Sequence, residues 1–250
     1  MENAPHRDEN TRACFPQTQW SVVLAAGHTE SPEADAALEK LCRDYWPPLY
    51  AAIRRHGHSP EEAQDLTQEF FAHLLRRHDV DIASPEKGRF RSLLLTMLKH
   101  FLINAWHREN CQKRGGGQVA VFLDAAPVEA RYQVELVDTA TPETVFERHW
   151  AFTVLDHTMN RLREEYASTG KTDLFDLLKE TLSSQKQTSR AELAARCGTS
   201  VGAVDVAVHR LRRRYGELLR EEIANTVSEP GEIEEEIRHL KAVLGRSGGR

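Results

Sequence analysis

The sequence predicts an all-α protein built from two small helical domains that are joined by an extended acidic linker. Apolar residues recur at three- and four-residue steps in most segments, which is the spacing of a helix with one buried face. Helix-capping signals stand at residues 59–62, 141–143 and 189–192, each directly before such a segment. The three glycines at 115–117 stop helical structure between two groups of helices. The chain is therefore expected to fold as two parts.

Composition and period divide the chain into five segments. We expect a flexible tail (1–17), a first domain (18–114), a linker (115–140), a second domain (141–227) and a C-terminal extension (228–250) that holds one amphipathic helix.

The linker is acidic and aperiodic. Between residues 118 and 140 it has four acidic residues against Arg131, a local net charge of −3. Because no helical period is present, we expect an extended conformation, with a short strand over 119–123 as the one regular element it could hold.

The overall composition is that of a globular protein, with 40% hydrophobic and 28% charged residues and a net charge of −5. Its four cysteines are scattered, with neither a close pair nor metal-ligand spacing, which fits a reducing compartment. No apolar run approaches the roughly 18 residues that a membrane span needs, and the first residues lack an apolar signal segment. We therefore expect a cytoplasmic protein without a membrane partner.

Two predicted helices of the first domain contain its candidate functional residues. The helix predicted over 59–75 places Asp65, Gln68 and Glu69 on its outer face. The following basic helix, over 90–114, buries one apolar stripe: Leu94, Met97, Leu98, Phe101, Leu102 and Ala105.

The opposite side of the basic helix combines cations with exposed apolar side chains. It carries Lys99, His100, Ile103, Trp106, His107, Asn110 and Arg114. From 87 to 114, seven basic residues stand against Glu109, a local net charge of +6. A groove for unpaired DNA needs positive charge for phosphates and a flat ring for bases. For Trp106 itself, a position in the core and a role in base stacking both remain open.

The second domain contains a helix-turn-helix pattern over 189–219. A short helix is followed by a tight turn at 197–199 and a long helix from Ser200. Eight basic residues stand against three acidic ones between 186 and 220, a local net charge of +5. We expect the start of the long helix to meet base edges and its arginines to hold phosphates.

In their order and combination, residues 59–75, 88–114 and 189–219 resemble the bacterial extracytoplasmic-function (ECF) sigma factors, the two-domain sigma subunits of RNA polymerase. The resemblance implies binding to core RNA polymerase and promoter-specific transcription initiation through minus-10 melting and minus-35 recognition. Core RNA polymerase and promoter DNA are the implied partners, and an anti-sigma factor is left open as a third.

The resemblance also assigns residues. Those implied for polymerase binding are Asp65, Gln68 and Glu69. Those implied for the minus-10 strand are Lys99, His100, Asn104, Trp106, His107, Arg108, Lys113 and Arg114. Those implied for the minus-35 duplex are Ser200, Gly202, Val206, His209, Arg210 and Arg213. The linker would thread the polymerase toward the RNA exit path. The sequence departs from the family at Asp205 and Ala207, where many members carry Lys and Arg.

Other classes of protein fit less well. His107 and Cys111 have helical metal-ligand spacing, but two ligands do not make a site, and we expect no metal or other cofactor. The glycines at 115–117 lack the Lys and Ser/Thr of a phosphate-binding loop, and no catalytic motif is visible, so we expect neither an enzyme nor a small-molecule substrate. The alternatives are a helix-turn-helix regulator that binds duplex DNA without joining polymerase, and a helical adaptor that binds no DNA.

Overall fold

The computed structural model describes residues 32–76, 89–111, 125–134, 140–182, 188–227 and 229–245. Every regular element in these ranges is helical, which confirms the predicted all-α class. The helices in chain order are α2 (Pro32–Arg55), α3 (Pro60–Arg76), α4 (Phe90–Cys111), α5 (Ala126–Val134), α6 (Pro142–Ser168), α7 (Thr172–Leu178), the 3-10 turn η3 (Lys179–Leu182), α8 (Arg190–Cys197), α9 (Val201–Ala224), the 3-10 turn η4 (Pro230–Glu232) and α10 (Ile233–Gly245). None of the helices in these ranges is long and apolar enough to cross a membrane.

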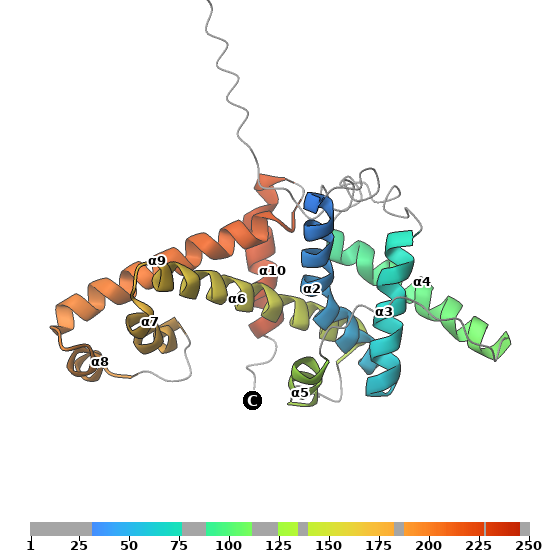
Figure 1. Ribbon diagram of the computed structural model, residues 1–250, viewed down its shortest axis with the longest axis horizontal. Coiled ribbons are helices and arrows are strands. Elements are labelled where there is room, and N and C mark those ends of the chain that lie inside the picture. The colour runs from blue at the N-terminus through green and yellow to red at the C-terminus, as the bar shows by residue number, and fades with distance from the viewer. Residues whose placement is uncertain are drawn as a thin grey trace, which may run out of the picture.

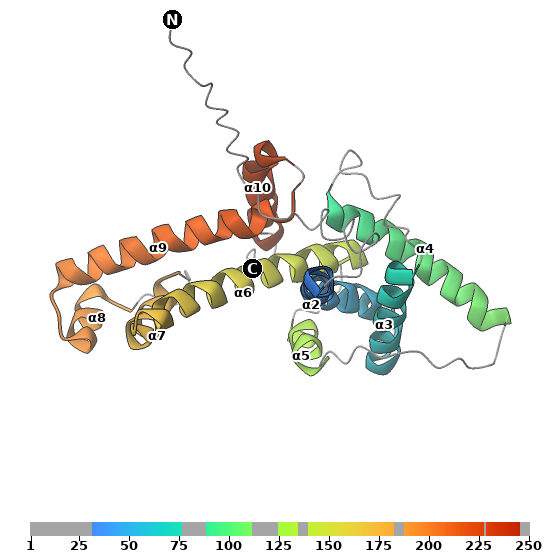
Figure 2. The same cartoon turned by 45° about the horizontal axis from the view of Figure 1, so that its top comes forward.

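The molecule is elongated, with the long helices α6 and α9 side by side along its length (Figure 1). At a rise of about 1.5 Å per residue, α6 alone is about 40 Å long. Helices α2, α3, α4 and α5 lie at one end of this pair, and α7 and α8 lie at the other (Figure 2).

Helix α2 contains Pro47 and Pro48, which we expected to bend or interrupt it. The helix is continuous from Pro32 to Arg55 and changes direction partway along (Figure 1). A proline removes one backbone hydrogen bond and crowds the preceding turn, so a bend is its usual effect inside a helix.

Two hydrophobic cores hold the helices together. The larger core joins α2, α3, α4, the first half of α6, the end of α9 and α10. Aromatic rings fix α4 within it, because Phe101 meets Phe70 of α3 edge-on at 5.6 Å and Phe90 meets Tyr45 of α2 at 5.3 Å. The smaller core joins the second half of α6 to α7, α8 and the first part of α9.

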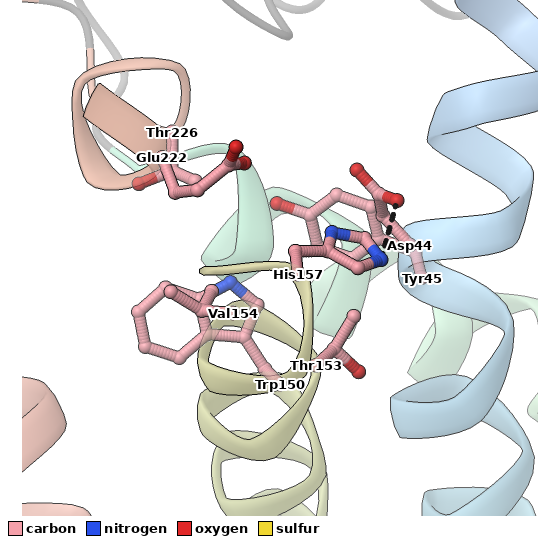
Figure 3. Close-up of a pocket in the computed structure, with 8 residues that line it drawn as sticks. All are labelled: Asp44, Tyr45, Trp150, Thr153, Val154, His157, Glu222 and Thr226. Carbon is pink, nitrogen blue, oxygen red and sulfur yellow. Dashed lines mark ion pairs between the residues drawn. The ribbon is translucent and has the colours of Figure 1, made fainter. Parts of the chain in front are cut away.

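Helices α6 and α9 therefore contribute to both cores. Where they meet α2, a small cavity is lined by side chains of all three helices (Figure 3). His157 of α6 lies 3.4 Å from Asp44 of α2 across this cavity, and Glu222 of α9 accepts a hydrogen bond of 2.7 Å from Arg161 of α6. Polar and charged side chains thus connect the three helices at the junction of the two cores.

The expected extended conformation of the linker is wrong for residues 126–134, which form α5. The Glu129 carboxylate accepts hydrogen bonds of 2.8 Å from two nitrogens of Arg54 and one of 2.7 Å from the Tyr50 hydroxyl. These bonds, with Arg54 first, lower the pKa of Glu129 to about 2. Tertiary contacts to α2, together with burial of Tyr132, stabilise a helix that has little amphipathic pattern of its own. The strand considered over 119–123 lies outside the described residues.

Candidate nucleic-acid interface

Helix α4 presents a face to solvent that combines Lys99 and two histidines with exposed apolar and aromatic side chains. Its buried side is the predicted one, since Leu94, Leu98, Phe101 and Ala105 are all buried in the larger core. The opposite side exposes Lys99, His100, Ile103, Asn104, Trp106 and His107. Its C-terminal end points away from the other helices (Figure 2).

Trp106 is 62% exposed and Ile103 is 55% exposed, so the indole does not belong to the core. The Trp106 and His107 rings meet edge-on with centroids 5.0 Å apart. Lys99 forms an ion pair of 2.7 Å with Glu143 at the start of α6, and this contact lowers the pKa of Glu143 to about 2. The side chain of Arg108, and Lys113 and Arg114 altogether, lie outside the described part of the chain.

The first cations of α4 are not free, which sequence reasoning missed. Arg91 is 3% exposed, forms an ion pair of 2.8 Å with Glu147 and another with Glu236, and stacks 4.6 Å from the centre of the Trp150 ring. Arg89 pairs with Glu236 at 2.9 Å. The acidic first turn of the C-terminal helix was the sequence signal that could have suggested these partners. The local charge of +6 therefore overstates what α4 offers to a nucleic acid.

The helix-turn-helix pattern is confirmed as a structure. The Ser189 hydroxyl accepts a hydrogen bond of 3.1 Å from the Glu192 amide and caps α8, and Ser200 caps α9 in the same way. Gly198 ends α8 with a φ of +63°, a left-handed conformation that glycine adopts without steric cost. All the residues predicted for the minus-35 duplex are exposed on α9 or at its cap: Ser200, Gly202, Val206, His209, Arg210 and Arg213.

The arginines of α9 differ in whether they bond to other parts of the protein. Arg214 donates to Glu165 of α6 at 2.6 and 2.8 Å, and Arg212 donates to the Thr181 carbonyl at 2.7 Å, so both hold α9 in place. Arg213 is exposed, and its guanidinium donates a hydrogen bond of 3.0 Å to Glu217 on its own helix.

Asp205 lies on the exposed face of α9 and forms an ion pair of 3.0 Å with Arg190 of α8. The pair offsets the negative charge that departs from the family pattern at this position. It also connects the two helices of the motif across their turn.

The residues predicted for polymerase binding lie together on α3. The capping box that begins this helix is present, because the Ser59 amide donates to Glu62 at 2.9 Å and the Glu62 amide donates to the Ser59 hydroxyl at 3.2 Å. Asp65 is exposed, and Gln68 and Glu69 are half-buried.

Across the described residues, no group of three His, Cys, Asp or Glu side chains is arranged to hold a metal ion. The α4 face and the helix-turn-helix lie at opposite ends of the molecule (Figures 1 and 2). A helix with an exposed aromatic ring and basic residues at one end, and this motif at the other, are both features of DNA-binding proteins.

A comparison with protein families finds a match for the first group of helices. Residues 41–111 match the family model of sigma-70 region 2, a stretch that covers most of α2 and all of α3 and α4. Residues 41–111 are therefore similar to sigma-70 region 2, which supports the predicted resemblance at the level of the sigma-70 family. The family implies a role in transcription initiation, with core RNA polymerase and promoter DNA as partners. Comparisons with curated proteins and with solved structures gave no match.

Proposed function

We propose that the protein is an ECF-type sigma factor, which binds core RNA polymerase in the cytoplasm and directs promoter-specific initiation. The observation that carries this proposal is the exposed indole of Trp106 beside Ile103 on the cationic face of α4, within a sigma-70 region 2 domain. A helix that only covered a core would have no use for a tryptophan that is 62% exposed.

The α4 face would hold the melted minus-10 strand. Unstacking a base costs a few kcal/mol, and stacking it on an aromatic ring returns about 1–3 kcal/mol. Trp106 would supply that ring, while the neighbouring cations attract the phosphates. The proposed set is Lys99, His100, Asn104, Trp106, His107, Arg108, Lys113 and Arg114.

The start of α9 would read the minus-35 duplex from the major groove. Val206 is 51% exposed and has the size and polarity to contact a thymine methyl group. Arg210 and Arg213, further along, would contact phosphates, whereas Arg212 and Arg214 are held by other parts of the protein. Ser200, Gly202 and His209 complete the proposed surface.

The functional division would follow the predicted domain bounds, with the first half of α6 and α10 completing the core of the first domain. Residues 18–114 would bind core polymerase and melt the minus-10 element, and residues 141–227 would recognise the minus-35 element. On α3, Asp65, Gln68 and Glu69 would contact the polymerase clamp.

Co-purification with core RNA polymerase tests this proposal. The wild-type chain should bind core polymerase, and an Asp65→Ala, Glu69→Ala double variant should bind it less. Glu164→Ala, an exposed change on the second half of α6, is the matched control and should bind as the wild type does. Failure of the wild type to bind core polymerase, with duplex DNA binding intact, would favour the conventional helix-turn-helix regulator instead.

A further inference from the structure

The C-terminal helix α10 packs against α6 and α9, and its first turn forms ion pairs with arginines at the beginning of α4. Its apolar residues Ile237, Leu240 and Val243 are buried in the larger core, together with Ile223 from the end of α9. In Figure 1, α10 crosses near the end of α9 and beside α6. Helix α10 therefore closes the core on which α4 rests.

The first turn of α10 carries three consecutive carboxylates, and each meets a cation. Glu236 is fully buried and pairs with both Arg89 and Arg91. Glu235 pairs with Arg89 at 2.8 Å, and Glu234 pairs with Arg220 of α9 at 3.1 Å.

Helix α10 depends on contacts with the rest of the protein for its structure. A helix of 13 residues is marginal in water by itself, so α10 depends on docking for its structure. Its carboxylates satisfy cations at the N-terminal end of α4, where the helix dipole further favours negative charge. A phosphate group would satisfy the same guanidinium groups with the same geometry.

Arg89 is the accessible member of this contact, with its side chain 24% exposed, while Arg91 is almost fully enclosed. Arg91 lies in the first turn of α4, the helix that carries Trp106, and Arg89 directly precedes that helix, so an anionic strand that follows α4 toward its beginning arrives at the place that Glu235 and Glu236 occupy. The acidic turn of α10 and a nucleic-acid backbone are thus alternative partners for these cations.

We propose that α10 is an intramolecular latch, whose acidic turn covers Arg89 and Arg91 and lowers the affinity of α4 for single-stranded DNA until a DNA strand displaces it. The proposal rests on the proposed function, since it takes α4 as the strand-binding helix. Displacement releases Glu235 and Glu236 from the cations and undocks α10, while α6 and α9 keep their contacts with each other.

The test uses the full chain with two conservative charge changes, Glu235→Gln and Glu236→Gln. Each keeps the size of the side chain, and Glu147 still pairs with Arg91. The matched control is the double variant Glu164→Gln, Glu180→Gln, which makes the same change of net charge at exposed positions of α6 and η3, away from α4. Circular dichroism verifies that both proteins are folded at the temperature used.

Affinity for a single-stranded oligonucleotide is measured by fluorescence anisotropy at low salt. The latch variant should bind about tenfold more tightly than the control, within the range of typical coupling between two sites. In hydrogen exchange, the amides of residues 233–245 in the wild type should lose protection when the oligonucleotide saturates the protein. Equal affinities of variant and control, or unchanged protection of α10 at saturation, would overturn the latch.

The same experiment separates failure of the latch from failure of the proposed function. If the wild type binds core polymerase and the oligonucleotide, but α10 stays protected, the sigma function stands and the latch is wrong. If no protein binds the oligonucleotide, α4 is not a strand-binding helix and the latch is refuted together with that step. A latch variant that is unfolded is replaced by Glu235→Gln alone, whose ion pair lies at the surface, and the same two outcomes decide.

Discussion

Acidification should destabilise the protein through His149, a histidine of α6 that is 1% exposed. Burial, with the Arg131 and Arg148 charges acting in the same direction, lowers the pKa of His149 from 6.5 to about 4. The unfolded chain therefore binds a proton at this residue in the window between these two values, while the folded chain does not. Stability is fully present above pH 6.5, falls as the pH drops toward 4, and stops falling from this cause below the folded pKa.

The magnitude follows from the two pKa values. One pKa unit corresponds to about 1.4 kcal/mol, so His149 should cost the folded state about 2 kcal/mol between pH 7.5 and pH 5. Urea unfolding followed by circular dichroism at these two pH values measures the loss. The variant His149→Leu has no group to titrate at this position, and its loss should be smaller than that of the wild type by about 2 kcal/mol.

Two comparisons make the measurement specific. The pKa of His56 is also lowered, chiefly by desolvation, but His56 is present in both proteins and its contribution cancels. The control His100→Leu makes the same substitution at an exposed position of α4 and reports the effect of replacing a surface histidine by leucine. If the wild type and His149→Leu lose the same free energy between the two pH values, the reasoning from burial is refuted.

Three further predictions concern the two proposed DNA-binding surfaces. Trp106→Ala should reduce open-complex formation about tenfold, because one base-stacking contact is lost. It should leave the melting temperature unchanged, because the indole is exposed. A lower melting temperature would place the indole in the core. Arg213→Ala should weaken promoter binding and reduce the slope of log affinity against log salt by about 1, whereas Arg212→Ala should lower stability by removing the bond to Thr181. An unchanged slope for Arg213→Ala would exclude a phosphate contact. Gly198→Ala should cost about 1–2 kcal/mol in urea unfolding, because its φ of +63° is strained for alanine although no atom lies within 4 Å of the added carbon. A cost near zero would contradict the strain argument.

The sequence predicted most of the helices, and it predicted which faces of α4 and α9 are exposed, because these features depend on local patterns. The apolar stripe of α4 and the capping residues Ser59, Ser189 and Ser200 are read within a few neighbouring positions. Sequence pattern alone left Trp106 ambiguous, because its place on the helix borders the apolar stripe, and the three-dimensional packing of α3 against Phe101 resolved it.

Long-range contacts account for what the sequence could not predict. Helix α5 is stabilised by Arg54, a residue 75 positions before Glu129, and nothing in the local period of the linker contains that information. The local net charge of residues 87–114 overstated the cations available to a ligand for the same reason, since Arg89 and Arg91 pair with carboxylates of α10 at the other end of the chain. A sum over a segment treats every cation as available, whereas folding commits some of them to distant partners.

Helix α6 belongs to both hydrophobic cores, and this has a consequence for how the protein unfolds. Trp150 lies in one core and Leu162 in the other, on a single uninterrupted helix. Loss of either core removes the support from half of that helix, and the fraying propagates toward the remaining core. The two ends of the molecule are thus expected to melt as one cooperative unit rather than as separate foldons. A mutation that destabilises α7 or α8 would then increase the rate of amide hydrogen exchange in α2, far from the substitution.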